Sequence, residues 1–309
     1  MATPLVEKLH AFYPEAKIDF LLRKGNELLL ANNPHISEVL VWDKAQNKTR
    51  NLLKMIIKVR RNKYSLVINV QRFFSTGLLS AISGANEVVG FDKNPLSFLF
   101  SRKIKHVIGT AEKPVHEAER NLMLIRHLTD DSFVKPEIYP SEQDFNAVKP
   151  EGEYVCLAPG SVWFTMQLPA DKWIGLIGLI AKSTSVYLLG GRDDIELCEN
   201  IRFYSNREQV FNLAGKINLL QSAALMKKAV MNYVNDSAPM HLASAVNAPV
   251  TAILCSTVPA FGFTPLSERS KVVETTEQLA CRPCGFHGFR SCPEGHFKCA
   301  NIDVKEILS

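Results

Sequence analysis

The sequence predicts an α/β protein of two doubly wound domains, in which helices cover both faces of mainly parallel sheets. Three observations support this: a length of 309 residues, alternating short apolar runs and helix-length segments, and a polar, proline-bearing stretch at 135–152 after which the alternation restarts. The length fits two domains of ~150 residues each. The composition, 46% hydrophobic and 22% charged, is that of a globular protein, and the longest clean apolar run, 173–181, is shorter than the ~20 residues of a membrane span. Membrane-spanning, fibrous and disordered classes are therefore excluded.

The first half opens with a helix, for which Thr3 is the expected N-cap and Pro4 the first helical residue. Near-continuous apolar runs then predict strands buried on both faces, and hence parallel, at 17–22, 38–42, 64–70 and 87–91. A doubly wound domain normally begins with a strand that lies in mid-sheet. Either the fold is unusual, or the first βα unit lacks its strand.

The second half repeats the pattern with five apolar runs and with helix-length segments that include 172–181 and 217–228. Its predicted strands are residues 154–158, 184–189, 210–213, 229–234 and 249–255. These patterns predict two Rossmann-like domains, one at 1–148 and one at 149–309, with a cysteine-rich tail at 280–300.

Charge is divided unevenly between the halves. Residues 1–150 hold 22 Lys and Arg against 16 Asp and Glu, whereas residues 151–309 hold 14 against 15. The segment 44–63 contains eight cations and no acid, with an apolar stripe at Leu52, Leu53, Ile56 and Val59. This pattern is typical of a basic amphipathic helix that lies on an anionic membrane or meets a phosphorylated partner, and equally of a helix with a solvated basic face. Nucleic-acid binding is disfavoured because the segment lacks interleaved aromatic residues.

The most specific segment is 234–245, VNDSAPMHLASA. It places Asp236, Ser237 and Ala238 between a strand end and a helix start, with His241 one turn into the helix. In open α/β sheets ligands bind beyond the carboxyl ends of strands, where helix amides can hold phosphate. Asp236 would then bind sugar hydroxyls, and Ser237 and the Ala238 amide would face a diphosphate. The alternative is that Asp236 and Ser237 only cap the helix.

Two further loops follow strands, and each alone is weak evidence. The turn Pro159-Gly160-Ser161 can bring backbone close to a ligand, as can the paired glycines of residues 190–194, GGRDD. Near the end of the chain, Cys281, Cys284, Cys292 and Cys299 are spaced C-x2-C-x7-C-x6-C, with His287 and His296 between them. Zinc is one interpretation of this cluster; reduced thiols or a local disulfide are favoured over it.

These segments resemble glycosyltransferase family 9, the ADP-heptose:lipopolysaccharide heptosyltransferases, over the full length. The resemblance rests on ATPLVEKLHAFYPEAKIDFL, YSLVINVQ, SGANEVVGFD, HEAERNL, APGSVW…LPADKW, GKINLLQSAALMKKA, NDSAPMHLASA and CRPC…CPEGHFKC. It implies a GT-B fold: two Rossmann-like domains facing across a cleft, the first missing its first strand. Residues 149–309 would bind the ADP-sugar, and residues 1–148 a lipid-anchored, phosphorylated oligosaccharide acceptor.

The resemblance further implies inverting heptose transfer from ADP-heptose to the lipid A–Kdo inner core, with no cofactor required. The sugar-diphosphate would meet Asp236, Ser237, Ala238 and His241, with phosphate at Ser161 and the nucleoside near Gly191, Asp193 and Asp194. Two departures stand out: Met166 occupies the place of the family's usual Lys, and the family's catalytic Asp, in a Gly-Asp pair, would lie upstream of Met1. We therefore expect upstream codons for a strand ending in Gly-Asp.

Two alternatives stay open: a catalytically inactive sugar-nucleotide-binding or scaffold protein of the same fold, and a transferase that uses another nucleotide-sugar donor. The expected location is the cytoplasm, with peripheral contact to the cytoplasmic face of the inner membrane. No nucleic-acid partner is expected.

Overall fold

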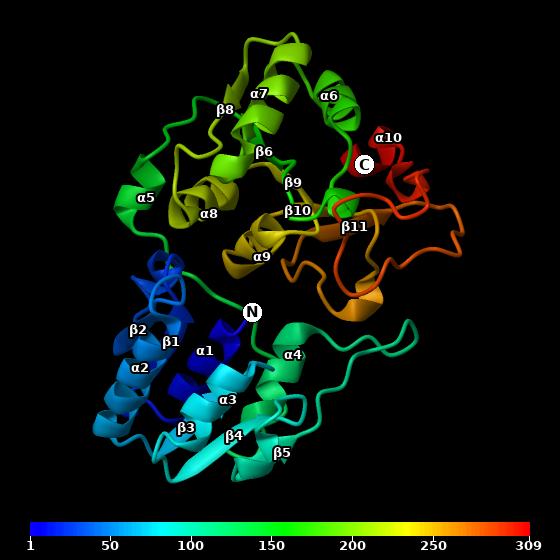
Figure 1. Cartoon of the computed structure of the whole chain (residues 1–309). Helices are drawn as coiled ribbons and strands as arrows, with labels where there is room; N and C mark the ends of the chain where they lie inside the picture. The colour runs from blue at the N-terminus through cyan, green and yellow to red at the C-terminus, as the bar shows by residue number, and fades with distance from the viewer. The chain divides into compact units, whose positions relative to one another are not determined.

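The computed structural model describes all residues from 1 to 309, and the chain divides into two compact units. Unit 1 comprises Met1–Ile108 and Val115–Pro136, and unit 2 comprises Gly109–Pro114 and Glu137–Ser309. Figure 1 shows the two units along the chain, with unit 1 mainly in blue to cyan and unit 2 in green to red. Each unit is described by itself.

Unit 1 contains five strands and four helices. They are α1 (Thr3–Phe12), β1 (Asp19–Arg23), β2 (Glu38–Trp42), α2 (Lys48–Asn62), β3 (Leu66–Asn69), α3 (Phe74–Ala81), β4 (Glu87–Phe91), β5 (Arg102–Ile104) and α4 (Glu117–Leu122). All strand pairs are parallel, but they form two separate sheets, β1-β2 and β3-β4-β5. No strand pairs with the second edge of β1 or of β3.

The core of unit 1 follows the apolar periodicity of its helices. Met55, Ile56 and Val59 of α2 pack with Leu40 and Trp42 of β2. Leu5 of α1 packs with Leu122 and Ile125, at the end of α4 and just beyond it. The helices therefore bury their apolar faces on the sheets, as the sequence pattern predicts.

Unit 2 contains the remaining six strands and six helices. They are α5 (Glu142–Asn146), β6 (Tyr154–Ala158), α6 (Ala170–Leu179), β7 (Ser185–Leu188), α7 (Ile195–Tyr204), β8 (Val210–Asn212), α8 (Leu219–Lys228), β9 (Met231–Asn235), α9 (Ala238–Ala245), β10 (Val250–Leu254), β11 (Ser270–Glu274) and α10 (Val304–Leu308). All six strands form one parallel sheet in the order β11-β10-β9-β6-β7-β8.

The sheet of unit 2 is covered on both faces, which makes it doubly wound (Figure 1). Alternate residues of β6 and β7, such as Val155 and Leu188, form the main core with Trp173 of α6, Ile201 of α7 and Ile307 of α10. Helices α8 and α9 pack together and contact β6 and β9. All five residues of β6 are buried, as expected for a central strand of a parallel sheet.

The structure contains a strand at each of the nine predicted positions, within a few residues at either end, and corrects two local predictions. Helix α1 has Ala2 as its N-cap, so Thr3 is the first helical residue. Leu53 does not belong to the buried stripe of α2: it is 56% exposed, because it lies one residue away from the inward-facing positions. Strands β5 and β11 were not predicted; both are short edge strands with charged residues.

No helix in the structure combines the length and the apolar character that crossing a membrane requires.

Candidate functional site

The predicted site loops of unit 2 gather at the carboxyl edge of its sheet. Strands β6 and β9 are neighbours at the point where strand order reverses, because β7 and β8 follow β6 in one direction while β10 and β11 follow β9 in the other. In open α/β sheets this switch point is where ligands bind. The loop after β6 carries Ser161, and the loop after β9 carries Asp236 and Ser237.

Asp236 is a buried carboxyl group held by one strong hydrogen bond. Thr257, just beyond β10, donates its hydroxyl to Asp236 Oδ2 at 2.6 Å, and only 7% of Asp236 is exposed. Burial raises the pKa of Asp236, and the bond from Thr257 opposes that rise. Thr257 was not predicted, because its contact with Asp236 spans 21 residues.

The capping interpretation of Asp236 and Ser237 is not supported by the structure. Ser237 is the N-cap of α9, but its side chain makes no capping bond; its hydroxyl points back to the carbonyl of Asn235 at 3.4 Å. The N-terminus of α9, with Ala238 first and Pro239 next, therefore has no side-chain carboxylate or hydroxyl on its amides. A helix N-terminus of this kind attracts anions. His241 lies one turn further on, its ring centroid 6.2 Å from that of Phe263.

Asn235, which sequence reasoning missed, joins the two loops at the switch point. Its fully buried amide donates to the carbonyl of Pro159 at 2.6 Å and accepts from the backbone N–H of Leu168 at 3.1 Å. These bonds fix both ends of the loop after β6 to the end of β9. The segment that carries Ser161 and Met166 is thus positioned against the Asp236 loop.

The loop after β6 also packs against the cysteine-rich tail. Thr165 accepts hydrogen bonds from Ser256 Oγ at 3.1 Å and from the backbone N–H of Phe289 at 2.8 Å. Met166 is half-buried beside Gly288, where an added Cβ would lie 2.7 Å from Met166 Cγ. Ser161 is half-buried, and its carbonyl accepts a bond from Gln167 at 2.5 Å.

The paired glycines after β7 accommodate Asp194. The Asp194 carboxylate accepts the Gly191 N–H at 2.7 Å, and a Cβ on Gly160 would lie 2.1 Å from Asp194 Oδ1. Gly190 is also constrained, since its Cβ would lie 2.6 Å from Asp194 Cβ. Asp194 thereby connects the loops after β6 and β7, while Asp193 is exposed to solvent.

Arg282 anchors the tail to the carboxyl ends of β10 and β11. It donates to the carbonyls of Cys255 at 2.7 Å and Thr257 at 2.6 Å and pairs with the Glu274 carboxylate at 2.6 Å. Cys281, Cys284, Cys292 and Cys299 are all free thiols. Cys281 Sγ lies 3.9 Å from His296 Nε2, and no group of three or more potential ligands in the chain is arranged to hold a metal ion.

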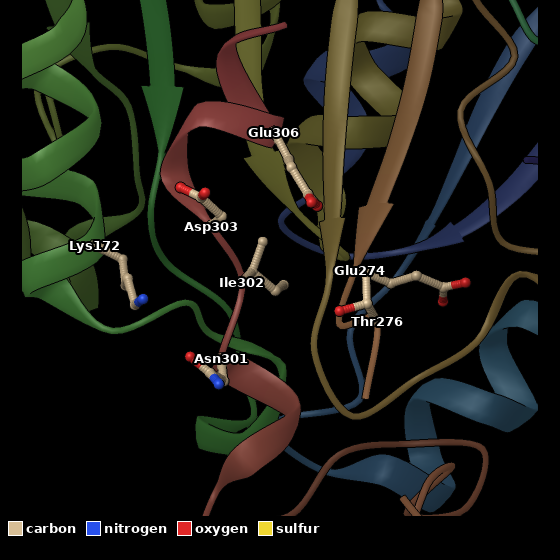
Figure 2. A pocket seen from close by; sticks show the side chains of 7 residues that line it. All are labelled: Lys172, Glu274, Thr276, Asn301, Ile302, Asp303 and Glu306. Atoms are coloured by element: carbon tan, nitrogen blue, oxygen red, sulfur yellow. The ribbon is translucent and has the colours of Figure 1, made fainter. Parts of the chain in front are cut away.

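A separate pocket of about 360 Å³ opens beside the tail, away from the predicted site residues. Figure 2 shows Lys172 of α6 on one side, Glu274 and Thr276 on the other, and the segment from Asn301 to Glu306 between them. Its lining carries three carboxylates against one cation, so it does not suit a diphosphate. The switch-point loops remain the candidate site.

The chain is similar to known proteins over most of its length. The sequence model of glycosyltransferase family 9 (heptosyltransferase) matches residues 52–286, which include the loops after β6, β7 and β9. A curated relative, lipopolysaccharide heptosyltransferase 3 of Escherichia coli, is 28% identical over 273 residues, which is 83% of this chain and 80% of the relative.

Solved structures share the fold. The E. coli ADP-heptose lipopolysaccharide heptosyltransferase II has a TM-score of 0.77 at 21% identity, covering 99% of this chain and 94% of that one. The E. coli heptosyltransferase WaaC, solved with ADP-2-deoxy-2-fluoro heptose, has a TM-score of 0.73 at 17% identity, with the same two coverages. The predicted GT-B fold class is therefore confirmed.

Proposed function

Because the chain belongs to glycosyltransferase family 9, the heptosyltransferases of lipopolysaccharide core synthesis, we propose that it transfers heptose from ADP-heptose to the inner core, on a lipid A–Kdo acceptor. The observation that carries the donor assignment is the switch-point arrangement of Asp236 beside the uncapped N-terminus of α9. Two solved structures similar to this chain support this assignment: one is an ADP-heptose lipopolysaccharide heptosyltransferase, and the other is a heptosyltransferase with ADP-2-deoxy-2-fluoro heptose.

In the proposed reaction an acceptor hydroxyl attacks the anomeric carbon in line with the departing ADP, which inverts the configuration at that carbon. The bond from that carbon to the diphosphate oxygen breaks, and the charge developing on ADP is stabilised by the amides at the start of α9. Asp236 accepts hydrogen bonds from hydroxyl groups of the heptose in the donor, and the hydrogen bond from Thr257 keeps the Asp236 carboxylate oriented. His241 and Ser161 contact the diphosphate, and the loop of Gly191, Asp193 and Asp194 approaches the nucleoside.

The hydroxyl proton goes to a carboxylate base. The family resemblance assigns this base to the Asp of a Gly-Asp pair. Transfer requires no metal in this proposal. A transfer assay with ADP-heptose and a lipid A–Kdo acceptor tests the reaction. We expect heptose to be transferred with release of ADP, and the absence of transfer would refute the proposed reaction.

Calorimetry with ADP tests the donor site independently of turnover. We expect D236N to bind ADP-heptose about tenfold more weakly, because a buried charge-assisted bond is lost, and to bind ADP nearly unchanged. D171N is the matched control: Asp171 is an exposed carboxylate in the first turn of α6. The donor assignment would be refuted if D236N and D171N lost affinity for ADP-heptose equally, or if wild-type protein bound neither ADP nor ADP-heptose.

Met166 favours one second candidate function, a sugar-nucleotide-binding protein without transferase activity. The Met166 thioether provides no positive charge for a departing diphosphate. In comparable sites, groups that stabilise the developing charge contribute several kcal/mol in total, about 3 kcal/mol for each donor. M166K distinguishes the two functions. A transferase gains rate from the added cation or keeps its rate, whereas the inactive protein transfers no heptose in either form. Competition by UDP-sugars and GDP-sugars tests the other open alternative, a different donor.

We also propose that α2 attaches the protein to the anionic cytoplasmic face of the inner membrane. Its outward face presents Leu53 and Ile57, 56% and 50% exposed, among cations that include Lys54 and Arg50. Each cation near an anionic surface contributes about 1 kcal/mol at moderate salt. Sedimentation with phosphatidylglycerol vesicles should be strong at low salt and lost at high salt, and should weaken in L53S/I57S. No sedimentation at low salt would refute this attachment.

A further inference from the structure

The cysteine-rich tail holds the thiols that solvent can reach, whereas the other four cysteines of the chain are buried. Cys281, Cys284 and Cys292 are half-buried free thiols. Burial raises the pKa of the Cys198 thiol to about 12 and that of the Cys299 thiol to about 11. Thiols of this kind keep their protons at neutral pH and are unreactive. Reactive sulfur is therefore confined to the half-buried thiols of the tail.

Cys281 has the surroundings of an attacking thiol. Its Sγ lies 3.9 Å from His296 Nε2. The other ring nitrogen of His296, Nδ1, accepts the backbone N–H of Lys298 at 3.1 Å. Because a neutral imidazole carries its hydrogen on one nitrogen only, this bond assigns the hydrogen to Nε2, the atom in contact with Cys281. An N–H donor beside the sulfur stabilises the thiolate, which is the form that attacks a disulfide.

Cys284 is the neighbouring thiol, at the spacing C-x2-C from Cys281. Its Sγ donates to the carbonyl of Cys281 at 3.3 Å, so the second thiol already lies against the residue that carries the first. Burial raises the pKa of Cys284, and the nearby sulfurs of Cys281 and Cys292 raise it further. Dithiols at this spacing act in disulfide exchange, where one thiol attacks and the second displaces. The contacts assign the first role to Cys281 and the second to Cys284.

The residue that follows Cys281 connects this dithiol to the candidate site. Arg282 donates to the carbonyl of Thr257 at 2.6 Å, and the hydroxyl of Thr257 donates in turn to Asp236. The backbone N–H of Cys284 donates to the carbonyl that precedes Thr257, at 3.1 Å. A change of backbone geometry between the two thiols therefore reaches the segment that holds the Asp236 carboxylate.

We propose that Cys281 and Cys284 form a thiol–disulfide exchange site for a low-molecular-weight disulfide such as glutathione disulfide, and that the bond formed between them weakens sugar-nucleotide binding. The Cys281 thiolate attacks one glutathione sulfur, the S–S bond of glutathione disulfide breaks, and the released glutathione thiolate takes up a proton. Cys284, after losing its proton, attacks the Cys281 sulfur of this mixed disulfide and displaces the second glutathione. Two protein thiols thus become one disulfide, and their protons leave on two molecules of glutathione.

Binding weakens because the two sulfurs have different partners in the reduced protein. Cys281 Sγ contacts His296, and Cys284 Sγ contacts a backbone carbonyl. Both contacts are lost when the sulfurs bond to each other, and the residues between them move. Arg282 then loses the geometry in which it holds Thr257. The effect on ADP-heptose rests on the proposed function, whereas the exchange reaction at the two thiols does not.

Mass spectrometry of the full chain after incubation with glutathione disulfide tests the exchange site. Wild-type protein should form an internal disulfide that dithiothreitol reverses. C284S should stop at the mixed disulfide and keep one glutathione, whereas C281S should form no mixed or internal disulfide. H296A should react about tenfold more slowly, because the thiolate loses its N–H donor. C292S is the matched control: Cys292 is a half-buried thiol of the same tail outside the C-x2-C pair, and its loss should change nothing.

Calorimetry with ADP-heptose on the reduced and oxidised forms measures the coupling. We expect oxidised wild-type protein to bind about tenfold more weakly, which corresponds to about 1.4 kcal/mol, and C281S treated in the same way to be unaffected. The tail of oxidised protein should also be cleaved faster in limited proteolysis, which reports the loosening without a ligand.

The proposal is overturned if glutathione disulfide leaves wild-type protein reduced, if C284S carries no glutathione, or if C292S fails to form the disulfide. It is also overturned if the reduced and oxidised forms bind ADP-heptose equally and are cleaved at the same rate. Disulfide formation and faster cleavage in a protein that binds no ADP-heptose in either form would instead count against the proposed function.

Discussion

Replacing Thr257 with Val should destabilise the protein in a pH-dependent way. The substitution keeps the shape of the side chain but removes the hydroxyl that donates to Asp236 Oδ2 at 2.6 Å. Thr257 is 3% exposed and Asp236 7%, so water cannot replace the lost donor without rearrangement. Loss of a buried bond to a charged group costs about 1.5–3 kcal/mol at neutral pH.

The sign of the pH dependence follows from the direction of the pKa shift. The pKa of folded Asp236 is raised by burial above its usual value of 3.8, so the folded state binds the proton more tightly than the unfolded state does. Stability therefore falls as pH rises from the unfolded pKa through the folded one. T257V raises the folded pKa further and widens this window. The penalty should be largest at neutral pH and shrink to about 1 kcal/mol once Asp236 is protonated in both proteins.

The assay is urea unfolding of wild-type, T257V and T251V between about pH 8 and pH 4.5. Thr251 is the matched control, because it is also 3% exposed but its hydroxyl contacts only Met231 Sδ, at 3.8 Å. We expect T251V to cost under about 1 kcal/mol at every pH. A T257V penalty that is constant with pH, or no larger than that of T251V, would refute the assignment of Asp236 as a buried, ionised acceptor.

Three further substitutions test the loops of the candidate site and the tail beside them. G190A should lower the free energy of unfolding in urea by about 1–3 kcal/mol, and it should do so in a D194A background as well, because the added methyl clashes with Asp194 Cβ. G160A should lower the free energy of unfolding by less. In the D194A background G160A should have no effect, because its clash is with the Asp194 carboxylate. Equal behaviour of the two glycines would contradict this geometry. R282M should lower the free energy of unfolding by about 3 kcal/mol, because the carbonyls of Cys255 and Thr257 lose their hydrogen-bond donor. The tail should then be cleaved faster in limited proteolysis. An unchanged cleavage rate would show that the tail is held by other contacts.

The central strands could be predicted from the sequence because a parallel strand buried on both faces needs an apolar side chain at nearly every position. Strand β6 meets this condition at all five residues. Strand β11 does not: Ser270 and Lys271 are exposed at the sheet edge, so its sequence shows no continuous apolar run. The same reason hides β5, three residues long with two charged side chains.

The loops of the candidate site were predictable, but the contacts that shape them were not. Asp236 and Ser237 stand out in the sequence because polar residues follow a strand directly. Asn235 and Thr257 bond across 76 and 21 residues, to Pro159 and Asp236. Local patterns carry no information on such pairings, which arise only when neighbouring strand ends meet. The packing of the Asp194 carboxylate against Gly160 was likewise not predictable from the spacing of these residues in the sequence.

The two separate sheets of unit 1 have a consequence for how the protein behaves in concentrated solution. β1 and β3 each have one edge to which no strand is paired, and Asp19–Leu22 and Leu66–Ile68 are only half-buried. Edges of this kind, apolar and with unpaired main-chain groups, are templates for strands of another molecule. Self-association of this protein should therefore begin in unit 1 and grow with concentration. A charged substitution such as V67K should weaken this association and leave the six-stranded sheet of unit 2 unchanged.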